Sequence, residues 1–373
     1  MAVKKSMPGC AGYSRATRAA VLATLALAAG AAAQKSPETL LLKDYRPVPI
    51  HKIPVTEVPK AKYPAVDMHT HVYAKTPEEV AEWVKTMDAA GTEKTIVLTG
   101  ATGERFDALQ RIYAKFPDRF DLWCGIDRSR AGQPDFAETA VRELERCFRA
   151  GARGVGEISD KGSGIFRGAD GARIHPDDPR LDPIWRKCGE LNLPVNIHVA
   201  DPIWAYGPMD ETNDGLMNAF KWRLDDKPDI VKFEGMMEIL ERTVKRHPGT
   251  IFIACHLANL DFDLTRLGRL LDTYPNLYVD VSARFGELAS TPRASAKFLI
   301  QYAGRVMYGT DQGRMERVYR RSFRILETLD EHFYYIDGFN YHWNLSGLGL
   351  PDPVLKQIYR DTALRLIART PRP

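Results

Sequence analysis

The chain of 373 residues contains only five cysteines, and no two of them stand in a CxxC spacing. This spacing argues against a zinc ribbon or a dithiol redox motif. Cys147 and Cys188 fall on consecutive predicted helices and could form a disulfide if the protein is exported. We favour the alternative, in which the cysteines beyond the N-terminal segment are buried free thiols.

Long hydrophobic runs are also missing. The only candidate, Ala19–Ala29, is shorter than the roughly 20 residues that span a bilayer. Basic residues precede it and Ala31–Ala33 follow it, which is the order of a secretory signal. We therefore expect residues 1–33 to be a signal peptide, and the protein to be exported to the periplasm or secreted. No membrane association is expected once this segment is removed.

Net charge is the third thing the chain lacks. The formal charge is +4, and residues 1–33 carry four basic and no acidic side chains, so the remaining chain is neutral. A neutral protein gives no reason to expect a nucleic acid or an anionic lipid surface as a partner. We expect a small-molecule substrate, and the sequence leaves the oligomeric state open, a homo-oligomer included.

What the chain does have is a regular alternation of short apolar runs and longer amphipathic stretches. The amphipathic stretches include Pro77–Ala90, Pro134–Ala150, Phe233–Arg246 and Asp261–Tyr274. Such alternation predicts a parallel α/β sheet, and eight units favour a closed (β/α)₈ TIM barrel over a doubly wound sheet. The eight predicted strands are 65–71, 95–101, 120–127, 152–159, 194–200, 250–257, 277–283 and 306–312.

Three segments fall outside this alternation. Residues 34–64 are rich in Pro and Lys and are expected to form an extended lead-in to a single barrel domain over residues 65–373. Residues 201–232, after the fifth strand, and 332–353, near the end, are predicted insertions. Insertions after barrel strands can form pocket walls or lids, and surface decoration is the alternative.

The first predicted strand ends in Asp67-Met68-His69-Thr70-His71. Residues i and i+2 of a strand point to the same side, so His69 and His71 are expected to project together at the C-terminal mouth of the barrel. Two neutral imidazoles held in this way suit a zinc-like ion. Alone, this pattern is weak evidence, because paired core or surface histidines are common.

Three more residues strengthen the metal hypothesis by their position. His198 and His256 end the fifth and sixth predicted strands, and Asp311 ends the eighth. Because catalytic groups in TIM barrels converge from the ends of different strands, we expect these side chains to share one metal site. The cofactor expected is one or two divalent ions, zinc first and manganese as the alternative.

Several motifs resemble those of the amidohydrolase superfamily, in particular the amidohydrolase-2 branch that includes aminocarboxymuconate semialdehyde decarboxylase-like proteins and related lactonases. The resemblance covers roughly residues 65–368 and rests on VDMHTH, residues 176–202, IACHLAN and VMYGTDQG. It implies that His69, His71 and His198 are metal ligands. It also implies that His256 is a ligand or polarises the substrate, and that Asp311 is a ligand and proton shuttle.

Glu157, in GVGEISD at the end of the fourth strand, lies in a stretch similar to one of TatD-type metal-dependent hydrolases, in which that carboxylate bridges two metals. It is therefore a candidate ligand, and a two-ion site would follow. The alternative is a structural carboxylate that pairs with the nearby Lys161.

Four residues are candidate substrate contacts. Arg284 follows the seventh strand and could bind a carboxylate through two nitrogens of its guanidinium group, the alternative being an exposed loop arginine. Trp204 and Tyr206 follow the strand of His198 closely enough to line a pocket, and Lys161 follows the strand of Glu157.

The function favoured by the sequence is metal-dependent hydrolysis of an amide, ester or lactone bond in a small substrate that could carry a carboxylate. Asp311 would move the proton, and His256 would help to polarise the carbonyl oxygen. Metal-dependent non-oxidative decarboxylation is the second hypothesis. A barrel that binds a ligand without catalysis is the third, and the complete set of ligand-type side chains argues against it.

Overall fold

The structure is a computed structural model that describes residues 36–169, 171–335 and 342–371. The expected signal peptide, residues 1–33, lies outside the described residues. The chain divides into two compact units, residues 1–46 and 47–373. In the first unit the described residues form one short 3₁₀ helix, η1 (Leu42–Asp44).

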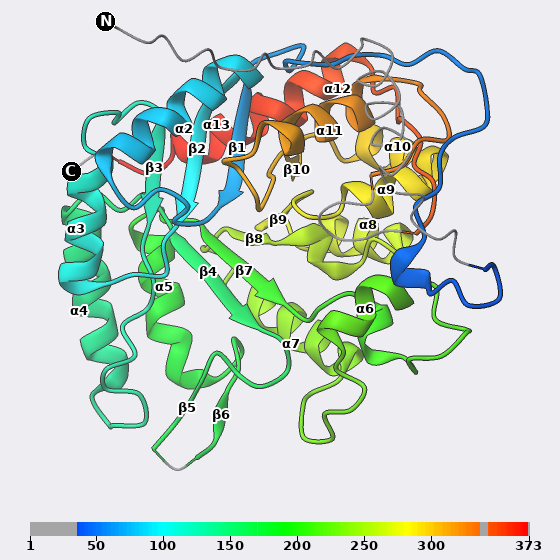
Figure 1. The fold of residues 1–373 in the computed structure, drawn as a ribbon. Helices are drawn as coiled ribbons and strands as arrows, with labels where there is room; N and C mark the ends of the chain where they lie inside the picture. The colour runs from blue at the N-terminus through cyan, green and yellow to red at the C-terminus, as the bar shows by residue number, and fades with distance from the viewer. Residues whose placement is uncertain (1–35, 170, 336–341, 372–373) are drawn as a thin grey trace, which may run out of the picture. The chain divides into compact units, whose positions relative to one another are not determined.

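The second unit is built on parallel strands that alternate with helices (Figure 1). Two parallel sheets have the strand orders β1-β2-β3 and β10-β9-β8-β7-β4. Their strands are β1 (Ala65–Thr70), β2 (Thr92–Leu98), β3 (Phe120–Trp123), β4 (Val155–Asp160), β7 (Val195–Val199), β8 (Phe252–Ala254), β9 (Leu277–Asp280) and β10 (Val306–Met307).

Backbone hydrogen bonds join the outer edges of these two sheets. Next to β3, the amide of Cys124 donates to Gly154 O (3.0 Å), and Gly156 N donates back to Cys124 O (2.8 Å). At the other edge, Met68 N of β1 donates to Tyr308 O just after β10 (3.0 Å). The predicted α/β barrel is thus confirmed, with β1 and β10 as neighbours.

The connections between the strands are mostly helical. The α-helices are α2 (Pro77–Ala90), α3 (Gly103–Tyr113), α4 (Phe136–Arg149), α5 (Asp182–Glu190), α6 (Leu216–Trp222), α7 (Phe233–Arg246), α8 (Leu264–Thr273), α9 (Phe285–Ser290), α10 (Pro292–Gln301), α11 (Glu316–Glu327), α12 (Asp352–Lys356) and α13 (Thr362–Ile367). Shorter turns are η2 (Pro179–Leu181), η3 (Ile203–Tyr206), η4 (His256–Asn259) and the π-helical η5 (Gln357–Asp361).

Local signals in the sequence explain why the best-predicted helices begin and end where they do. In α2, the Thr76 side chain accepts a hydrogen bond from Glu79 N, and Pro77 occupies the first helical position. The helix ends at Gly91, whose φ of 77° is the left-handed conformation that glycine adopts without strain. Accordingly, α2 and α7 have the predicted bounds, and α4 differs from its prediction by one or two residues at each end.

Elsewhere the observed elements differ from those predicted. The eighth strand, predicted over 306–312, is only Val306–Met307, because the following residues turn into the site. The predicted insertion 201–232 contains η3 and α6. A two-stranded hairpin after β4, β5 (Phe166–Arg167) and β6 (Arg173–Ile174), was not predicted, because its strands are too short to show periodicity. Part of the second insertion, residues 336–341, lies outside the described residues.

Two apolar clusters fill the described fold. The larger lies between strands and helices, and the smaller combines strand residues such as Val66, Met68 and Trp123 with Ala363 and Leu366 of α13. Leu366 also lies beside Pro194 and Ile251, which precede β7 and β8, so α13 covers the N-terminal ends of strands. The C-terminal ends are thereby left for the site.

The remaining expectations concern the cysteines and the membrane. The four cysteines in the described residues are all buried and free, so no Cys147–Cys188 disulfide is formed, as favoured from the sequence. Within the described residues, no helix has the length and apolar character needed to cross a bilayer.

Candidate metal centre and active site

An irregularity in β1 brings His69 and His71 to the mouth of the barrel. Met68 belongs to the smaller apolar cluster. The pairing of β1 with β2 changes register between Asp67 and Thr70, which breaks the strict alternation of the strand. The His69 side chain is fully buried, that of His71 is one-third exposed, and their rings lie 5.3 Å apart between centroids.

Asp67 connects this strand end to the segment that carries Asp311. Its carboxylate accepts hydrogen bonds from Thr310 N (2.9 Å) and Thr310 Oγ1 (2.7 Å). Asp311 N in turn donates to His69 O (2.7 Å). Gly309 passes so close that a Cβ there would lie 3.0 Å from His69 Cβ, so glycine permits this approach.

Non-glycine residues adopt left-handed backbone conformations where several strands end. They include Ala200 after β7 (φ 67°), His256 after β8 (57°), Ala283 after β9 (52°) and Asp311 after β10 (61°). This conformation costs on the order of 1 kcal/mol or more for each non-glycine residue, and it clusters where a site demands it. The backbone is thus bent at the strand ends that supply the candidate site.

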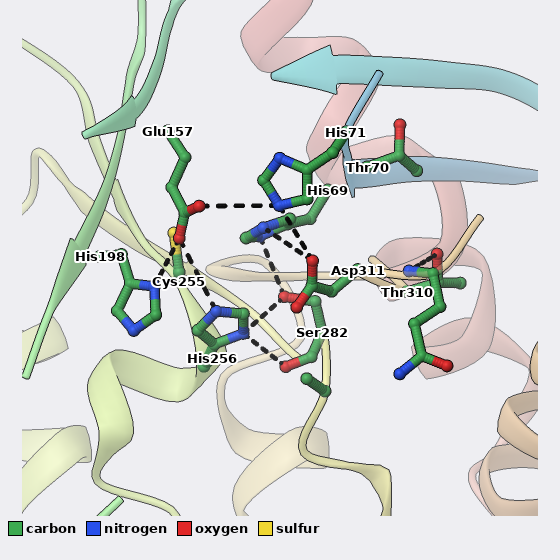
Figure 2. Close-up of polar contacts among 12 residues, drawn as sticks. His69, Thr70, His71, Glu157, His198, Cys255, His256, Ser282, Thr310 and Asp311 are labelled. Carbon is green, nitrogen blue, oxygen red and sulfur yellow. Dashed lines mark hydrogen bonds and ion pairs between the residues drawn. The ribbon is translucent and has the colours of Figure 1, made fainter. Parts of the chain in front are cut away.

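Glu157, the third residue of β4, faces three histidines (Figure 2). Its carboxylate pairs with His198 Nδ1 and lies 3.6 Å from His71 Nε2 and 3.9 Å from His256 Nε2. Burial raises the pKa of Glu157, but the facing histidines, His198 foremost, hold it below the ordinary value. Glu157 is therefore ionised at the centre of the cluster.

His69 is oriented by β9. Its Nδ1 lies 3.1 Å from Asp280 Oδ2 and 3.0 Å from Ser282 Oγ, so Nδ1–H has a buried carboxylate to donate to. The opposite nitrogen, Nε2, is buried and has no hydrogen-bond partner among the described residues. Burial lowers the pKa of His69, but the carboxylates of Asp280 and then Asp311 raise it to about 10. This location therefore favours positive charge.

His256 is held in a defined tautomer. Its Nδ1 lies 2.8 Å from the Ser282 carbonyl oxygen, which can only accept, so Nδ1 carries the proton. Burial and the neighbouring His198 hold the pKa of His256 well below its ordinary value, which keeps the ring neutral. Nε2 then presents a lone pair, which favours a ligand role over the polarisation of a carbonyl by hydrogen-bond donation.

His198 is placed differently from the other histidines. Its Nδ1 pairs with Glu157, and its Nε2 lies 3.4 Å from Asp201 Oδ1. Its ring centroid is 4.6 Å from that of His256. Burial lowers the pKa of His198, but Glu157 and Asp201 raise it above the ordinary value. In this arrangement His198 bridges two carboxylates at the edge of the cluster.

The chemistry of these donors fits a divalent cation. Two groups of side chains each bring their possible ligand atoms within 4.8 Å of one another. The first group is His69, His71 and Asp311, and the second is His69, Glu157, Cys255 and His256. Imidazole nitrogens with carboxylate oxygens are the donor set of catalytic zinc sites. The buried Nε2 of His69, which lacks a hydrogen-bond partner among the described residues, is the observation that supports this fit. His198 belongs to neither group, but it pairs with Glu157, which belongs to the second.

A cavity of about 120 Å³, which we call the inner cavity, opens beside this cluster. His198, His256 and Asp311 line it on the side of the cluster, and Arg284 is part of its wall. Further lining residues are Lys161, Asp201, Trp204, Asn218 and Trp222. The candidate ligands are thus accessible to a small molecule.

Arg284 is a buried residue, which overturns the alternative of an exposed loop arginine. It is only 6% exposed, its Nε lies 3.2 Å from Asp261 Oδ1, and its Nη2 donates to Asn259. These contacts fix the guanidinium group in the wall of the inner cavity. A fixed guanidinium suits a carboxylate ligand.

The other candidate substrate contacts divide into two groups. Trp204 and Lys161 line the inner cavity, and Lys161 Nζ pairs with Asp201 (2.9 Å) rather than with Glu157. Tyr206 does not line this cavity in the described structure. Its hydroxyl accepts a hydrogen bond from Asp201 N (3.2 Å) and its ring packs on Phe233 at 5.8 Å, so it supports the wall from behind.

Comparison with known proteins identifies the family. The model of the family described as "Amidohydrolase" matches residues 66–369, which is most of the chain. This chain belongs to the amidohydrolase family. It is accordingly an enzyme of the metal-dependent hydrolase type. A separate search of curated protein sequences found no match.

Several solved structures are similar to this chain at low sequence identity, and the first of them supports the barrel fold. A TIM-barrel protein from Bordetella bronchiseptica is 15% identical, with 82% of this chain and 99% of that chain covered and a TM-score of 0.50. A 4-oxalomesaconate hydratase from Rhodopseudomonas palustris is 16% identical (82% and 96% covered, TM-score 0.49). A zinc-bound amidohydrolase from Burkholderia multivorans is 14% identical (82% and 99% covered, TM-score 0.46).

Several residues of this amidohydrolase's site were missed from the sequence. Asp280 and Ser282 of DVSA orient His69 and His256, yet in sequence they are ordinary residues at the end of a strand. Asp201 is a third missed residue, and its position three residues after His198 is the feature of the sequence from which it could have been predicted. Cys255 is a fourth, next to His256, and its thiol donates to Asn196 Oδ1 (2.8 Å).

Proposed function

We propose that this amidohydrolase is a metal-dependent hydrolase that cleaves an amide, ester or lactone bond in a small carboxylate-bearing substrate. The observation that carries the proposal is the convergence of histidines and carboxylates from different strand ends on one cavity that also contains a fixed arginine. His69, His71 and Asp311 would hold one ion, with Glu157 and His256 completing the site or holding a second. Zinc is the ion we propose.

When bound, such an ion polarises a carbonyl oxygen and lowers the pKa of water toward neutrality, so that a nucleophile is available at pH 7. The protein's own part begins with Asp311, whose Oδ1 lies 3.0 Å from His71 Nε2 and which lines the inner cavity. A carboxylate in this position accepts a proton from the attacking water and returns it to the leaving group.

Arg284 and Lys161 would orient the substrate. Asp261 fixes Arg284, and Asp201 pairs with Lys161, so both side chains are held in the wall of the inner cavity. Two positively charged groups in this wall favour a ligand that carries negative charge. An anchored carboxylate would keep the scissile carbonyl close to Asp311 and so raise the effective concentration of the reacting groups.

The test is metal analysis combined with a substrate panel. The purified full chain should contain zinc, and Asp311→Asn should lower kcat about 10²–10⁴-fold on a carboxylate-bearing ester, lactone or amide that the wild type hydrolyses. Glu157→Ala should lose one ion if the site holds two, whereas unchanged stoichiometry would remove the bridging role. Arg284→Lys should raise KM more than it lowers kcat.

Two outcomes would contradict the proposal. Release of CO₂ without acid release from the same panel would indicate decarboxylation. A zinc-loaded protein that turns over none of the panel would indicate a barrel that binds ligand without catalysis.

A further inference from the structure

A second and larger cavity, of about 430 Å³, adjoins the inner cavity. We call it the outer cavity. Trp204 lines both cavities, and Asp261 in the outer wall pairs with Arg284 in the inner wall. Its volume lies within the range of small-molecule sites, and none of the candidate metal ligands lines it. The outer cavity is therefore a separate feature that the proposed chemistry leaves unused.

Aromatic rings form much of the outer wall. Trp204 and Trp343 lie 5.7 Å apart between ring centroids with planes tilted by 40°, and Phe262 lines the same cavity. Trp343 is anchored by a hydrogen bond from its Nε1 to Gly286 O (3.2 Å). The negative faces of indole rings attract cations, tryptophan most strongly among the aromatic side chains.

The charged groups of the outer wall have one sign. Asp214, Asp261 and Glu287 line it, and none of its described lining residues is basic. Asp261 is compensated by Arg284 from the inner side, whereas Asp214 is exposed at the cavity. Burial raises the pKa of Asp261 even against the attraction of Arg284, so a further positive charge here would stabilise its ionised form.

We propose that the outer cavity is a binding site for an organic ammonium ion, held against the adjacent indole rings of Trp204 and Trp343 and balanced by the carboxylates of the wall. A compact alkylammonium group matches this wall because it is apolar on its surface and carries a full positive charge. The proposal does not depend on the proposed hydrolysis, since binding at the outer cavity requires neither metal nor turnover.

The test compares two ligands of the same shape and different charge. Choline and its neutral carbon analogue, 3,3-dimethylbutan-1-ol, are titrated calorimetrically into the full chain, with zinc present and after chelation. Choline is expected to bind about ten-fold more tightly than the alcohol or better, equally with and without zinc, and more weakly at higher salt.

Variants locate the binding. Asp214→Asn should weaken choline several-fold and leave the alcohol unchanged, whereas Trp343→Leu should remove most of the preference for choline. Asp229→Asn is the matched control, because it makes the same charge change at an exposed position of the same insertion that does not line the cavity. Equal binding of the two ligands, no binding of choline, or equal effects of the Asp214 and Asp229 variants would each overturn the proposal.

Discussion

At the scale of single residues, the candidate metal centre depends on which ring nitrogen of each histidine is free. His69 directs Nδ1 at Asp280, the last residue of β9, and His256 directs Nδ1 at the carbonyl oxygen of Ser282, two residues further on. Asp280 also accepts from His256 N (3.0 Å), so one carboxylate supports both ligands. Hydrogen bonds of this kind fix the tautomer and raise the basicity of a metal-binding imidazole.

Asp280→Asn should therefore lower zinc affinity about 10–100-fold, because the orienting carboxylate and its negative charge are lost. Competition for zinc with a chromophoric chelator measures this change. Ser282→Ala is the matched variant, since it removes a contact to the same two imidazoles but leaves the carboxylate, and a smaller loss is expected. If Asp280→Asn binds zinc as tightly as the wild type while remaining folded, the positioning role is wrong.

A residue of the candidate site could be predicted from the sequence where its type is unusual for its position in a strand or loop. Histidines at the ends of apolar strands are unusual, so His69 and His256 were predicted as candidate ligands. Asp280 was not, because an aspartate after a strand resembles any polar residue at an element boundary. The special conformation of Ala200 and Ala283 was equally invisible, since alanine carries no signal for a left-handed backbone.

At the scale of elements, one half-buried side chain connects two of the helices. Glu143 of α4 accepts hydrogen bonds from Arg146 Nε (2.9 Å) and from Gly103 N at the start of α3 (2.7 Å). Arg146 also pairs with Asp107 of α3 (2.9 Å). Burial raises the pKa of Glu143, but Arg146 and the Gly103 amide lower it to about 2.

This shift predicts a pH-dependent contribution to stability. Because the folded pKa is lower than the unfolded value, the contribution is present above about pH 4.5 and is lost as the pH falls toward 2. Glu143→Gln should cost about 1–2 kcal/mol at pH 7, a value reduced for solvent screening. Urea unfolding measures this change: the difference in the free energy of unfolding between wild type and Glu143→Gln should be smaller at pH 3 than at pH 7.

Glu138→Gln is the control for this experiment, since Glu138 is exposed on the same helix and pairs with the exposed Arg142 one turn further on. Its effect on stability should be small at both pH values. A Glu143→Gln variant that is as stable as wild type at pH 7 would contradict the prediction.

Elements were predictable where local physics decides them. The helix α2 has capping residues at both ends, and α7 has an amphipathic face, so their bounds followed from the sequence. The strand β10 was overestimated, because its continuation is pulled away from the sheet by the bonds of Thr310 to Asp67. That pull is a contact between residues 243 positions apart, which no local pattern contains.

At the scale of the whole molecule, the proposed metal centre joins strands from both ends of the barrel sequence. Its candidate ligands lie on β1 and β4 or directly after β1, β8 and β10, and these strands come from both of the parallel sheets. A ligand that binds only the folded state stabilises it by mass action. The barrel itself was predictable as a whole, because eight alternating units leave few other topologies.

Removal of the metal should accordingly lower the melting temperature. At a zinc concentration about 100 times Kd the stabilisation is about 2.7 kcal/mol, which corresponds to a shift of about 3–5 °C. Differential scanning calorimetry before and after chelation measures it, and added zinc should restore the original value. The His69→Ala variant should show no such shift, and a shift of wild-type size in this variant would mean that the ion stabilises the protein elsewhere.

The contact between β1 and the Gly309–Asp311 segment also sets an order of events during synthesis. His69 emerges from the ribosome some 240 residues before Asp311, its partner on the segment after β10. A nascent chain therefore carries an incomplete set of ligands until nearly the whole barrel has been translated. Tight capture of the cation would then mark the moment at which the last strand meets the first, and incomplete chains would remain distinguishable by their weak hold on it.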